Sequence, residues 1–355
     1  MSALRFLGIF AALGFALFAI RGHSRRRISR LSLIIAVVLS AAVIIVAIWP
    51  NVFDPIFTTF NFNPPKTPVE SEARTRLIFL LMVAVLVLLF LLLRVQSAAD
   101  VNERSIRQLV EALGQERFDW ERARMIPEGP RLVTVSPAFN EAENVAAVNN
   151  KIPDEIDGLL VVPLVVSDGS DDRTAEVARE AGAYVAELPI RRGGGLALRV
   201  GYDIALKLGA DIVVTLDADG QHMPEEIPVM IGPIVRGEAD YVNGSRLLGT
   251  FEKESLIRHV GVHFFSRFIT ILTGRRITDP SSGYRAARAD LLKQLVLEQD
   301  QFWTSEILIE ALRHKATVVE VPVTIEARKG GKSKKPKSLK YGYYFSKVII
   351  QTWLR

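Results

Sequence analysis

The chain has 355 residues, enough for more than one folding unit, and its formal net charge at pH 7 is +5. It contains no cysteine, which excludes a disulfide framework, thiolate metal sites and thiol nucleophiles. Apolar residues make up 49% of the chain and charged residues 23%, a mixture that suits membrane segments joined to a soluble domain.

Three runs near the N-terminus, residues 6–20, 31–49 and 77–93, contain no charged residue. Crossing the hydrocarbon core of a bilayer takes about 20 mostly apolar residues. We predict a membrane domain over residues 1–97, with transmembrane helices at about residues 4–21, 31–50 and 77–95. The first run is short enough for a signal peptide, but its N-terminal side carries only Arg5 and no clear cleavage site follows.

The loop between the first two runs is rich in arginine and contains Arg21, Arg25, Arg26, Arg27 and Arg30. An excess of Lys and Arg in a short loop marks the cytoplasmic side of a membrane. We therefore expect an integral membrane protein, of the plasma membrane if it is bacterial. Its N-terminus and residues 51–76 are expected outside and everything after Arg94 in the cytoplasm, with self-association through the membrane helices as an option.

Residues 98–128 are charged but place Ile106, Leu109, Val110 and Leu113 at helical spacing. This pattern predicts an amphipathic connector helix that lies on the membrane surface or packs on the next domain.

From Arg131 onward, short β-branched runs alternate with longer helical patterns. The predicted strands cover residues 131–137, 158–168, 183–188, 210–219 and 239–245. Strands separated by helix-length segments predict a mainly parallel sheet with helices on both faces. The expected fold class is therefore α/β, in a domain over residues 129–327.

Four predicted strands end in polar segments, namely PAFNEAENV (137–145), SDGSDDRT (167–174), DADGQH (217–222) and NGSR (243–246). Any one of these is typical of a turn or a helix cap, and that explanation is the better one for Asn144, Asp171 and Asp172. Open α/β sheets bind ligands beyond the carboxyl ends of their strands. Four polar ends at one edge therefore favour a binding site.

Asp217 and Asp219 lie two residues apart after the fourth strand and can reach the same side of its end. Paired carboxylates suit Mg²⁺ or Mn²⁺, which are commonly held by one or two carboxylates plus substrate phosphates. Gln221 offers a further oxygen, and we rank His222 below it because hard cations prefer oxygen. The competing explanation is an acidic helix start, since two glutamates follow.

A glycine cluster, RRGGGLALRVG at residues 191–201, opens a predicted helix whose backbone N–H groups could face phosphates. The cluster does not fit GxGxxG well and is a weak signal alone. The absence of GxxxxGK[ST] excludes a P-loop NTPase.

The order and approximate spacing of PAFNE, SDGSDDRT, DADGQ, NGSR, TDPSSGYR (278–285) and RKGGKSK (328–334) resemble family 2 glycosyltransferases. The closest resemblance is to dolichol-phosphate mannose synthase and the bacterial polyprenyl-phosphate glycosyltransferases, over roughly residues 130–345. It implies a GT-A fold, a nucleotide-sugar donor and a divalent metal ion. The membrane part resembles the small three-span domains sometimes fused to these enzymes.

The resemblance also implies roles for single residues. Donor-binding positions would be Pro137, Phe139, Glu141, Asp168, Arg192, Gly193 and Asp217. Asp219 and Gln221 would hold the metal ion, with Asp217 as a further candidate ligand. Arg246 would meet a donor or acceptor phosphate and Glu306 would lie near the sugar, so the implied catalytic set is Asp217, Asp219, Arg246 and Glu306.

The RxxGxSK pattern of the family is matched by Arg328, Gly331, Ser333 and Lys334. In the family this mobile segment closes over the diphosphate and the lipid phosphate, which implies acceptor contacts for Arg328, Ser333 and Lys334. Residues 328–355 are thus expected to form a basic lid and a membrane-associated C-terminal segment.

One motif departs from the family. Relatives commonly read NxGKGxAL where this chain has RRGGGLAL, so Gly194 stands at the lysine position and Arg191 at the asparagine position. A phosphate or sugar contact is then either missing or made by Arg191 or Arg192 instead. The identity of the donor is therefore left open.

We predict an inverting glycosyltransferase that moves a hexose from a GDP-mannose- or UDP-glucose-type donor to a polyprenyl phosphate at the cytoplasmic face. Such a phosphate is largely ionised near neutral pH, with a second pKa of about 6, so no strong general base is required. Nucleic acid is not an expected partner.

Three alternatives stay open. A glycolipid synthase acting on a lipid hydroxyl would need a base, for which Glu306 is the candidate. A processive polysaccharide synthase would carry QxxRW, whereas Gln351 begins QTWLR. An inert membrane scaffold is disfavoured by the DxD sequence at Asp217 and Asp219.

Overall fold

The computed structural model describes residues 3–24, 28, 30–49, 68–251, 256–326 and 338–354. It divides into two compact units, Met1–Ile106 and Arg107–Arg355. Most of the expected outer loop and the lid residues Arg328, Ser333 and Lys334 lie outside the described residues. The expected limits of the connector and of the glycosyltransferase domain stay predictions.

The first unit is helical. Helix α1 (Ala3–Ser24), helix α2 (Arg30–Ile48) and helix α4 (Pro68–Glu116) cover the three apolar runs. Within the described residues, one helical stretch, Phe6–Ser24, is long and apolar enough to cross a membrane, and Ser32–Ile45 is a shorter apolar helix. By this criterion, one of the three expected spans is supported.

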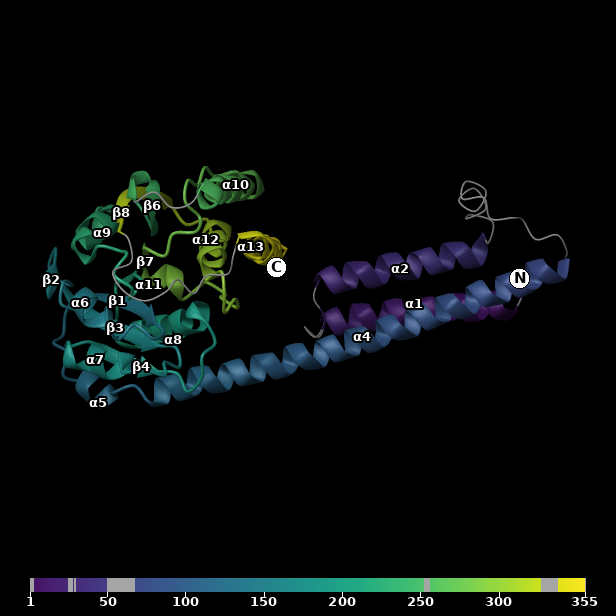
Figure 1. Cartoon of the computed structure of the whole chain (residues 1–355), viewed down its shortest axis with the longest axis horizontal. Coiled ribbons are helices and arrows are strands. Elements are labelled where there is room, and N and C mark those ends of the chain that lie inside the picture. Colours follow the sequence, from purple (N-terminus) through teal and green to yellow (C-terminus); the bar gives the residue numbers. More distant parts are fainter. Residues whose placement is uncertain are drawn as a thin grey trace. The chain divides into compact units, whose positions relative to one another are not determined.

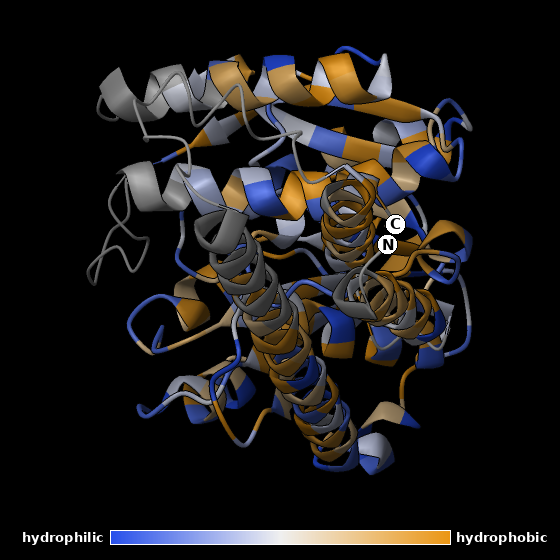
Figure 2. Ribbon diagram, turned by 90° about the vertical axis from the view of Figure 1, so that its right-hand side faces the viewer, coloured by the Kyte–Doolittle hydropathy of each residue, from blue (hydrophilic) through white to orange (hydrophobic). Residues whose placement is uncertain are grey.

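The three helices pack through a small cluster formed by Phe15, Ala19, Ala36 and Leu93. Many large apolar side chains lie outside it and are exposed, among them Phe6, Leu7, Phe10, Leu17, Val38, Trp49, Leu88 and Leu92. Toward Glu116, the apolar stretch of α4 gives way to mixed polar and apolar residues (Figure 2). Helices that are apolar on their outer faces suit an apolar surrounding, such as lipid.

The second unit is an α/β domain in which helices flank a sheet (Figure 1). Its strands are β1 (Arg131–Ala138), β2 (Glu155–Ile156), β3 (Leu159–Ser167), β4 (Tyr184–Glu187), β5 (Ile212–Thr215), β6 (Tyr241–Phe251), β7 (Arg285–Arg288) and β8 (Val318–Ile325). Its helices after α4 are α5 (Trp120–Ala123), α6 (Val145–Asn149), α7 (Thr174–Glu180), α8 (Gly194–Lys207), the 3₁₀ turn η2 (Pro224–Glu226), α9 (Ile227–Val235), α10 (Leu256–Thr273), α11 (Ala289–Leu292), α12 (Trp303–Arg313) and α13 (Ser338–Trp353).

The strand order is β2-β3-β1-β5-β7-β6-β8, and β4 also pairs with β3. Strand β1 is parallel to β3 and β5, β4 to β3, and β8 to β6. Strand β7 is antiparallel to both β5 and β6. The sheet is therefore mixed, whereas the sequence predicted a mainly parallel one. The prediction missed β7 because its four residues, RAAR, contain no β-branched residue and gave no strand signal.

Alternating residues of the central strands face two apolar layers. Val133 and Val135 join the layer that contains α8 and α12, while Leu132 joins the layer that contains α9. Val110 of α4 is also buried in the first layer, so the last turns of this helix pack on the domain. With both faces covered, the carboxyl ends of β1, β3, β5 and β6 are left as the place where polar side chains gather.

Candidate functional site

The loops that follow β1 and β3 are hydrogen-bonded to each other. Asn140, with a φ of 53°, donates its N–H to Ser170 Oγ at 3.1 Å, and its side-chain oxygen accepts the Asp171 N–H at 2.9 Å. The Glu141 N–H donates to Thr174 Oγ1 at 2.8 Å. Asparagine adopts this left-handed conformation more readily than most residues. The first two polar strand ends therefore form one wall.

Polar side chains of the two loops stiffen this wall. Asn144 Nδ2 donates to the buried Glu141 carboxylate at 3.0 Å. Asp172 accepts the N–H groups of Ala142 at 3.2 Å and Thr174 at 3.0 Å. These contacts agree with a structural role for Asn144 and Asp172. The donor contact of Glu141 stays a prediction, as does that of Pro137 in β1.

Asp168, directly after β3, is buried and holds the start of the glycine cluster. Its carboxylate accepts the Arg192 N–H at 2.8 Å and the Gly193 N–H at 2.7 Å. Burial raises the pKa of Asp168, while the two backbone hydrogen bonds and the nearby Arg191 act in the opposite direction. Asp168 therefore orders the loop in front of α8.

Two glycines of the cluster are explained by a neighbouring backbone. Gly193 has a φ of 117°, and a Cβ there would lie 2.6 Å from the carbonyl oxygen of Asp300. A Cβ at Gly195 would overlap the carbonyl oxygen of Gln299. Both glycines thus permit residues 299–300 to pack closely on the N-terminus of α8. An approach of phosphate is not needed to account for them.

Gly194 stands apart from these two, because a Cβ there would lie 3.2 Å from the indole nitrogen of Trp303. A lysine at this position would have to pass beside that ring.

The two arginines at the start of the cluster differ in their surroundings. Arg191 is exposed and lies over the ring of Phe139. Arg192 is partly buried and forms an ion pair instead.

Asp217 and Asp219 follow β5, and the Asp217 N–H donates to His222 Nδ1 at 2.9 Å. This hydrogen bond places the proton of a neutral His222 on Nε2. The His222 ring is buried and stacks on Tyr284, with centroids 5.1 Å apart. His222 therefore supports the loop, which agrees with its rank below Gln221 as a ligand.

The two predicted metal ligands are joined to each other, because Asp219 Oδ1 accepts the Gln221 N–H at 3.1 Å. Gln221 Nε2 donates to the Glu326 carbonyl at 3.2 Å, and the Gln221 carbonyl accepts the Glu326 N–H at 3.0 Å. The loop after β5 is thus tied to the end of β8. Glu326 lies two residues before Arg328 in the sequence.

These side chains fit a hard divalent cation. Asp217 and Asp219 supply carboxylate oxygens, and the hydrogen bond to Glu326 uses the nitrogen of Gln221, so its oxygen would be the ligand atom. The described part of the chain contains no group of three or more His, Cys, Asp or Glu that could hold a metal ion. A metal ion here would therefore need ligands from a substrate, such as diphosphate oxygens.

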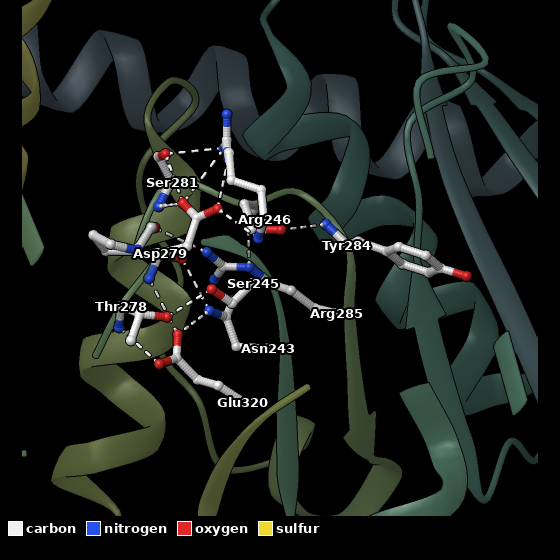
Figure 3. Close-up of polar contacts among 11 residues, drawn as sticks. Asn243, Ser245, Arg246, Thr278, Asp279, Ser281, Tyr284, Arg285 and Glu320 are labelled. Carbon is white, nitrogen blue, oxygen red and sulfur yellow. Dashed lines mark hydrogen bonds and ion pairs between the residues drawn. The ribbon is translucent and has the colours of Figure 1, made fainter. Parts of the chain in front are cut away.

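The polar end of β6 joins the segment TDPSSGYR (Figure 3). Arg246 Nε lies 2.6 Å from the buried Asp279 carboxylate, and Arg246 Nη2 donates to Ser281 Oγ at 3.1 Å. Glu320 of β8 accepts the N–H groups of Thr278 at 2.7 Å and Asp279 at 3.2 Å. Arg246 is thus held at the sheet edge by a carboxylate, and its phosphate contact stays a prediction.

Sequence reasoning missed Arg285, which is fully buried at the end of the same segment. Its guanidinium donates to the Ser282 carbonyl at 2.8 Å, the Pro280 carbonyl at 3.1 Å and the Tyr241 hydroxyl at 2.7 Å. It also donates to the Thr304 carbonyl. Arg285 therefore ties residues 280–282 to β6 and to the start of α12. The one sequence signal for Arg285 was its position as the last residue of TDPSSGYR.

Glu306 of α12 is fully buried. Its carboxylate accepts the N–H groups of Glu298 at 2.8 Å and Gln299 at 2.9 Å. These residues directly precede Asp300, so Glu306 shapes the segment that packs on the glycine cluster. The placement of Glu306 near the sugar stays a prediction.

Comparison with known proteins gives consistent matches. The model of the family described as "Glycosyl transferase family 2" matches residues 134–296. An undecaprenyl-phosphate mannosyltransferase of Micrococcus luteus is 30% identical over 215 residues, which cover 58% of this chain and 87% of the relative. A UDP-N-acetylglucosamine–dolichyl-phosphate N-acetylglucosaminyltransferase of Methanococcus voltae is 34% identical over 212 residues, which cover 53% of this chain and 83% of the relative.

Among solved structures, a glucosyl-3-phosphoglycerate synthase from Mycobacterium tuberculosis has a similar fold. That structure contains Mn²⁺, uridine diphosphate and glucosyl-3-phosphoglycerate. The match has a TM-score of 0.51 at 24% identity and covers 66% of this chain and 81% of the other.

Proposed function

Because the chain belongs to glycosyltransferase family 2 and has a GT-A-like α/β fold, we propose that it transfers a hexose from a nucleotide-sugar to a polyprenyl phosphate. One observation carries this proposal. The polar ends of β1, β3, β5 and β6 meet at one sheet edge. The chain is also similar to two enzymes that are named for a lipid-phosphate substrate, undecaprenyl phosphate in one and dolichyl phosphate in the other. The sugar is proposed only as a class, since those relatives are named for mannose and N-acetylglucosamine.

The donor would occupy the wall formed by the first two strand ends and the glycine cluster. Phe139 and the exposed Arg191 supply a flat ring and a cation there. Asp168 keeps the adjoining loop in one conformation through the N–H groups of Arg192 and Gly193. This arrangement suits a nucleoside with an attached diphosphate, because the ring can stack on a base and a guanidinium forms charge-assisted hydrogen bonds with phosphate.

The divalent ion would be held by Asp219 and Gln221, with Asp217 as a further ligand. When bound, a divalent cation stabilises negative charge on the departing diphosphate. Asp217 is 35% exposed, which leaves its side chain accessible to a substrate. Either Mg²⁺ or Mn²⁺ suits these oxygen donors.

The acceptor phosphate would attack the anomeric carbon from the face opposite the departing diphosphate, which gives inversion. Its second pKa of about 6 makes the attacking oxygen anionic near neutral pH without a general base. Arg246, with Arg328 and Lys334 of the lid, would offset the charge of the two phosphates.

The buried Glu306 bears on the choice of acceptor. A lipid hydroxyl would need a general base within hydrogen-bond reach. Both oxygens of the Glu306 carboxylate accept backbone N–H groups, an arrangement that suits a positioning role. This favours the phosphate acceptor over the lipid hydroxyl.

We also propose that α1, α2 and α4 span a membrane, with the N-terminus outside and the glycosyltransferase domain in the cytoplasm. Two observations support this topology. Many large apolar side chains of the first unit are exposed. The loop between the first two apolar runs carries five arginines within residues 21–30.

The direct test incubates membranes containing the full-length protein with polyprenyl phosphate, Mn²⁺ and labelled UDP-glucose, GDP-mannose or UDP-N-acetylglucosamine. We expect one donor to yield a labelled lipid that mild acid hydrolyses, and membranes with the Asp219→Ala variant to form it at least about 100-fold more slowly. A labelled lipid stable to mild acid would favour the lipid-hydroxyl alternative. Absence of labelled lipid with all three donors, in Mn²⁺ and again in Mg²⁺, would count against the proposal.

A further inference from the structure

The Asp300 carboxylate lies among guanidinium groups from three parts of the second unit. One oxygen is 3.3 Å from Arg107 Nε of α4 and 2.6 Å from Arg199 Nη2 of α8. The other is 3.1 Å from Arg192 Nη2 of the glycine cluster. The Asp300 side chain is only 12% exposed, so solvent screens these ion pairs weakly.

The main chain of Asp300 is attached to the same loop. Its carbonyl oxygen accepts the Gly195 N–H at 2.9 Å, in the first turn of α8. The lack of a side chain at Gly193 permits this approach, since a Cβ there would lie 2.6 Å from the same oxygen. Asp300 therefore holds the cluster both by its backbone and, through Arg192, by its side chain.

Two aspartates thus hold residues 192–195, Asp168 by its carboxylate and Asp300 by both its carboxylate and its backbone carbonyl. Asp168 binds the backbone N–H groups of Arg192 and Gly193, and Asp300 binds the Arg192 side chain and the Gly195 N–H. Glu306 in turn binds the N–H groups of the two residues before Asp300. A loss of the Asp300 charge would leave guanidinium groups close together in a poorly solvated place, which is strongly unfavourable.

We propose that Asp300 is a positioning residue for donor binding. It holds Arg192 and residues 193–195 in one conformation next to the proposed donor wall, without contacting the donor itself. This inference rests on the proposed function for its catalytic consequence. Its structural consequence, the order of residues 192–195, can be measured without any substrate.

A charge-neutral variant of the same shape tests the catalytic consequence. In the full-length protein, Asp300→Asn should raise the donor KM about tenfold, equivalent to about 1.4 kcal/mol. The acceptor KM and kcat should change by less than about twofold, because a positioning residue of the donor wall affects uniform binding of the donor rather than the chemical step. Asp300→Glu keeps the charge and should recover part of the lost donor affinity.

Glu111→Gln is the matched control, because Glu111 pairs with Arg199 Nε at 2.8 Å and so belongs to the same group of charges. Glu111 has no hydrogen bond or ion pair to residues 191–196 among the contacts of the described residues. The donor KM of the Glu111→Gln variant should equal that of the wild type. A normal donor KM in Asp300→Asn, or an equal rise in Glu111→Gln, would overturn the proposal.

Hydrogen–deuterium exchange of the ligand-free protein separates this inference from the proposed function. Peptides covering residues 191–196 should exchange about tenfold faster in Asp300→Asn than in the wild type or Glu111→Gln, because an opening cost of 1.4 kcal/mol is lost. Unchanged exchange would refute the positioning role whatever the substrate is. If Asp300→Asn exchanges faster but the wild-type protein transfers no sugar, only the proposed reaction is refuted.

Discussion

The guanidinium carbon of Arg191 lies 4.0 Å from the centroid of the Phe139 ring. Arg191 begins the glycine cluster and Phe139 directly follows β1, so the contact joins two of the polar segments at the sheet edge. Arg192, its neighbour, is instead paired with Asp300 at 3.1 Å. Of the two arginines that could replace the contact of the family lysine, Arg191 is therefore the one that presents its charge to solvent.

Arg191→Ala should weaken binding of uridine or guanosine diphosphate about tenfold, since a hydrogen bond to a charged group contributes about 1.5–3 kcal/mol. Isothermal titration in the presence of Mn²⁺ measures this directly. Arg179→Ala is a suitable control, because Arg179 is an exposed arginine of α7 that pairs with Glu187. Equal affinity of the Arg191→Ala variant and the wild type would place the diphosphate elsewhere.

Asp219→Ala should lower the rate of sugar transfer by about 10²–10³-fold, because it removes a ligand of the ion that stabilises the leaving diphosphate. The rate of labelled-lipid formation and the thermal unfolding midpoint are measured together, and the midpoint should not change. Asp171→Ala, an exposed aspartate at the same sheet edge, should retain full activity. If Asp219→Ala transfers sugar at the wild-type rate in the presence of excess chelator, the metal assignment is wrong.

Asp279→Asn should lower the free energy of unfolding by about 3–5 kcal/mol, because it neutralises a fully buried carboxylate that is paired with Arg246. Denaturant unfolding of the purified protein measures the loss. In the double variant Asp279→Asn with Arg246→Met, the loss should be smaller than the sum of the single losses. Additive losses would show that the ion pair contributes nothing of its own.

The raised pKa of Asp168 predicts a pH-dependent stability. A carboxyl whose folded-state pKa lies above 3.8 binds its proton more tightly in the folded protein than in the unfolded chain. Its contribution to the free energy of unfolding is therefore largest below 3.8 and falls as pH rises through the raised pKa. The difference in unfolding free energy between the wild type and Asp168→Asn should decrease across this window. A difference that rises with pH would contradict the direction of the shift.

Single introduced cysteines can test the membrane topology, because the natural chain has none. In intact cells, a membrane-impermeant maleimide should label Thr58→Cys, which lies between the second and third apolar runs. Ser24→Cys and the exposed Lys293→Cys should react only after the membrane is permeabilised. Labelling of Lys293→Cys in intact cells would reverse the proposed orientation.

Local patterns in the sequence were enough for part of this protein. The β-branched runs that became β1, β3, β4, β5 and β6 were visible because strand formation depends on neighbouring residues. The polar segments after four of them identified the sheet edge, since parallel strands end on the same side. The family resemblance rested on those segments, and the comparisons confirm a family 2 glycosyltransferase.

The tertiary structure decided what the polar groups at that edge contact. Arg192 and Asp300 are 108 residues apart in the sequence, and no periodicity connects them. Strand β7 lies between β5 and β6 and makes the sheet mixed, although its own sequence carries no strand signal. Glu306 and Asp168 hold backbone N–H groups because burial leaves a carboxylate with no water to bind, so it must find donors in the chain. Such pairings depend on how distant segments pack, which local sequence does not encode.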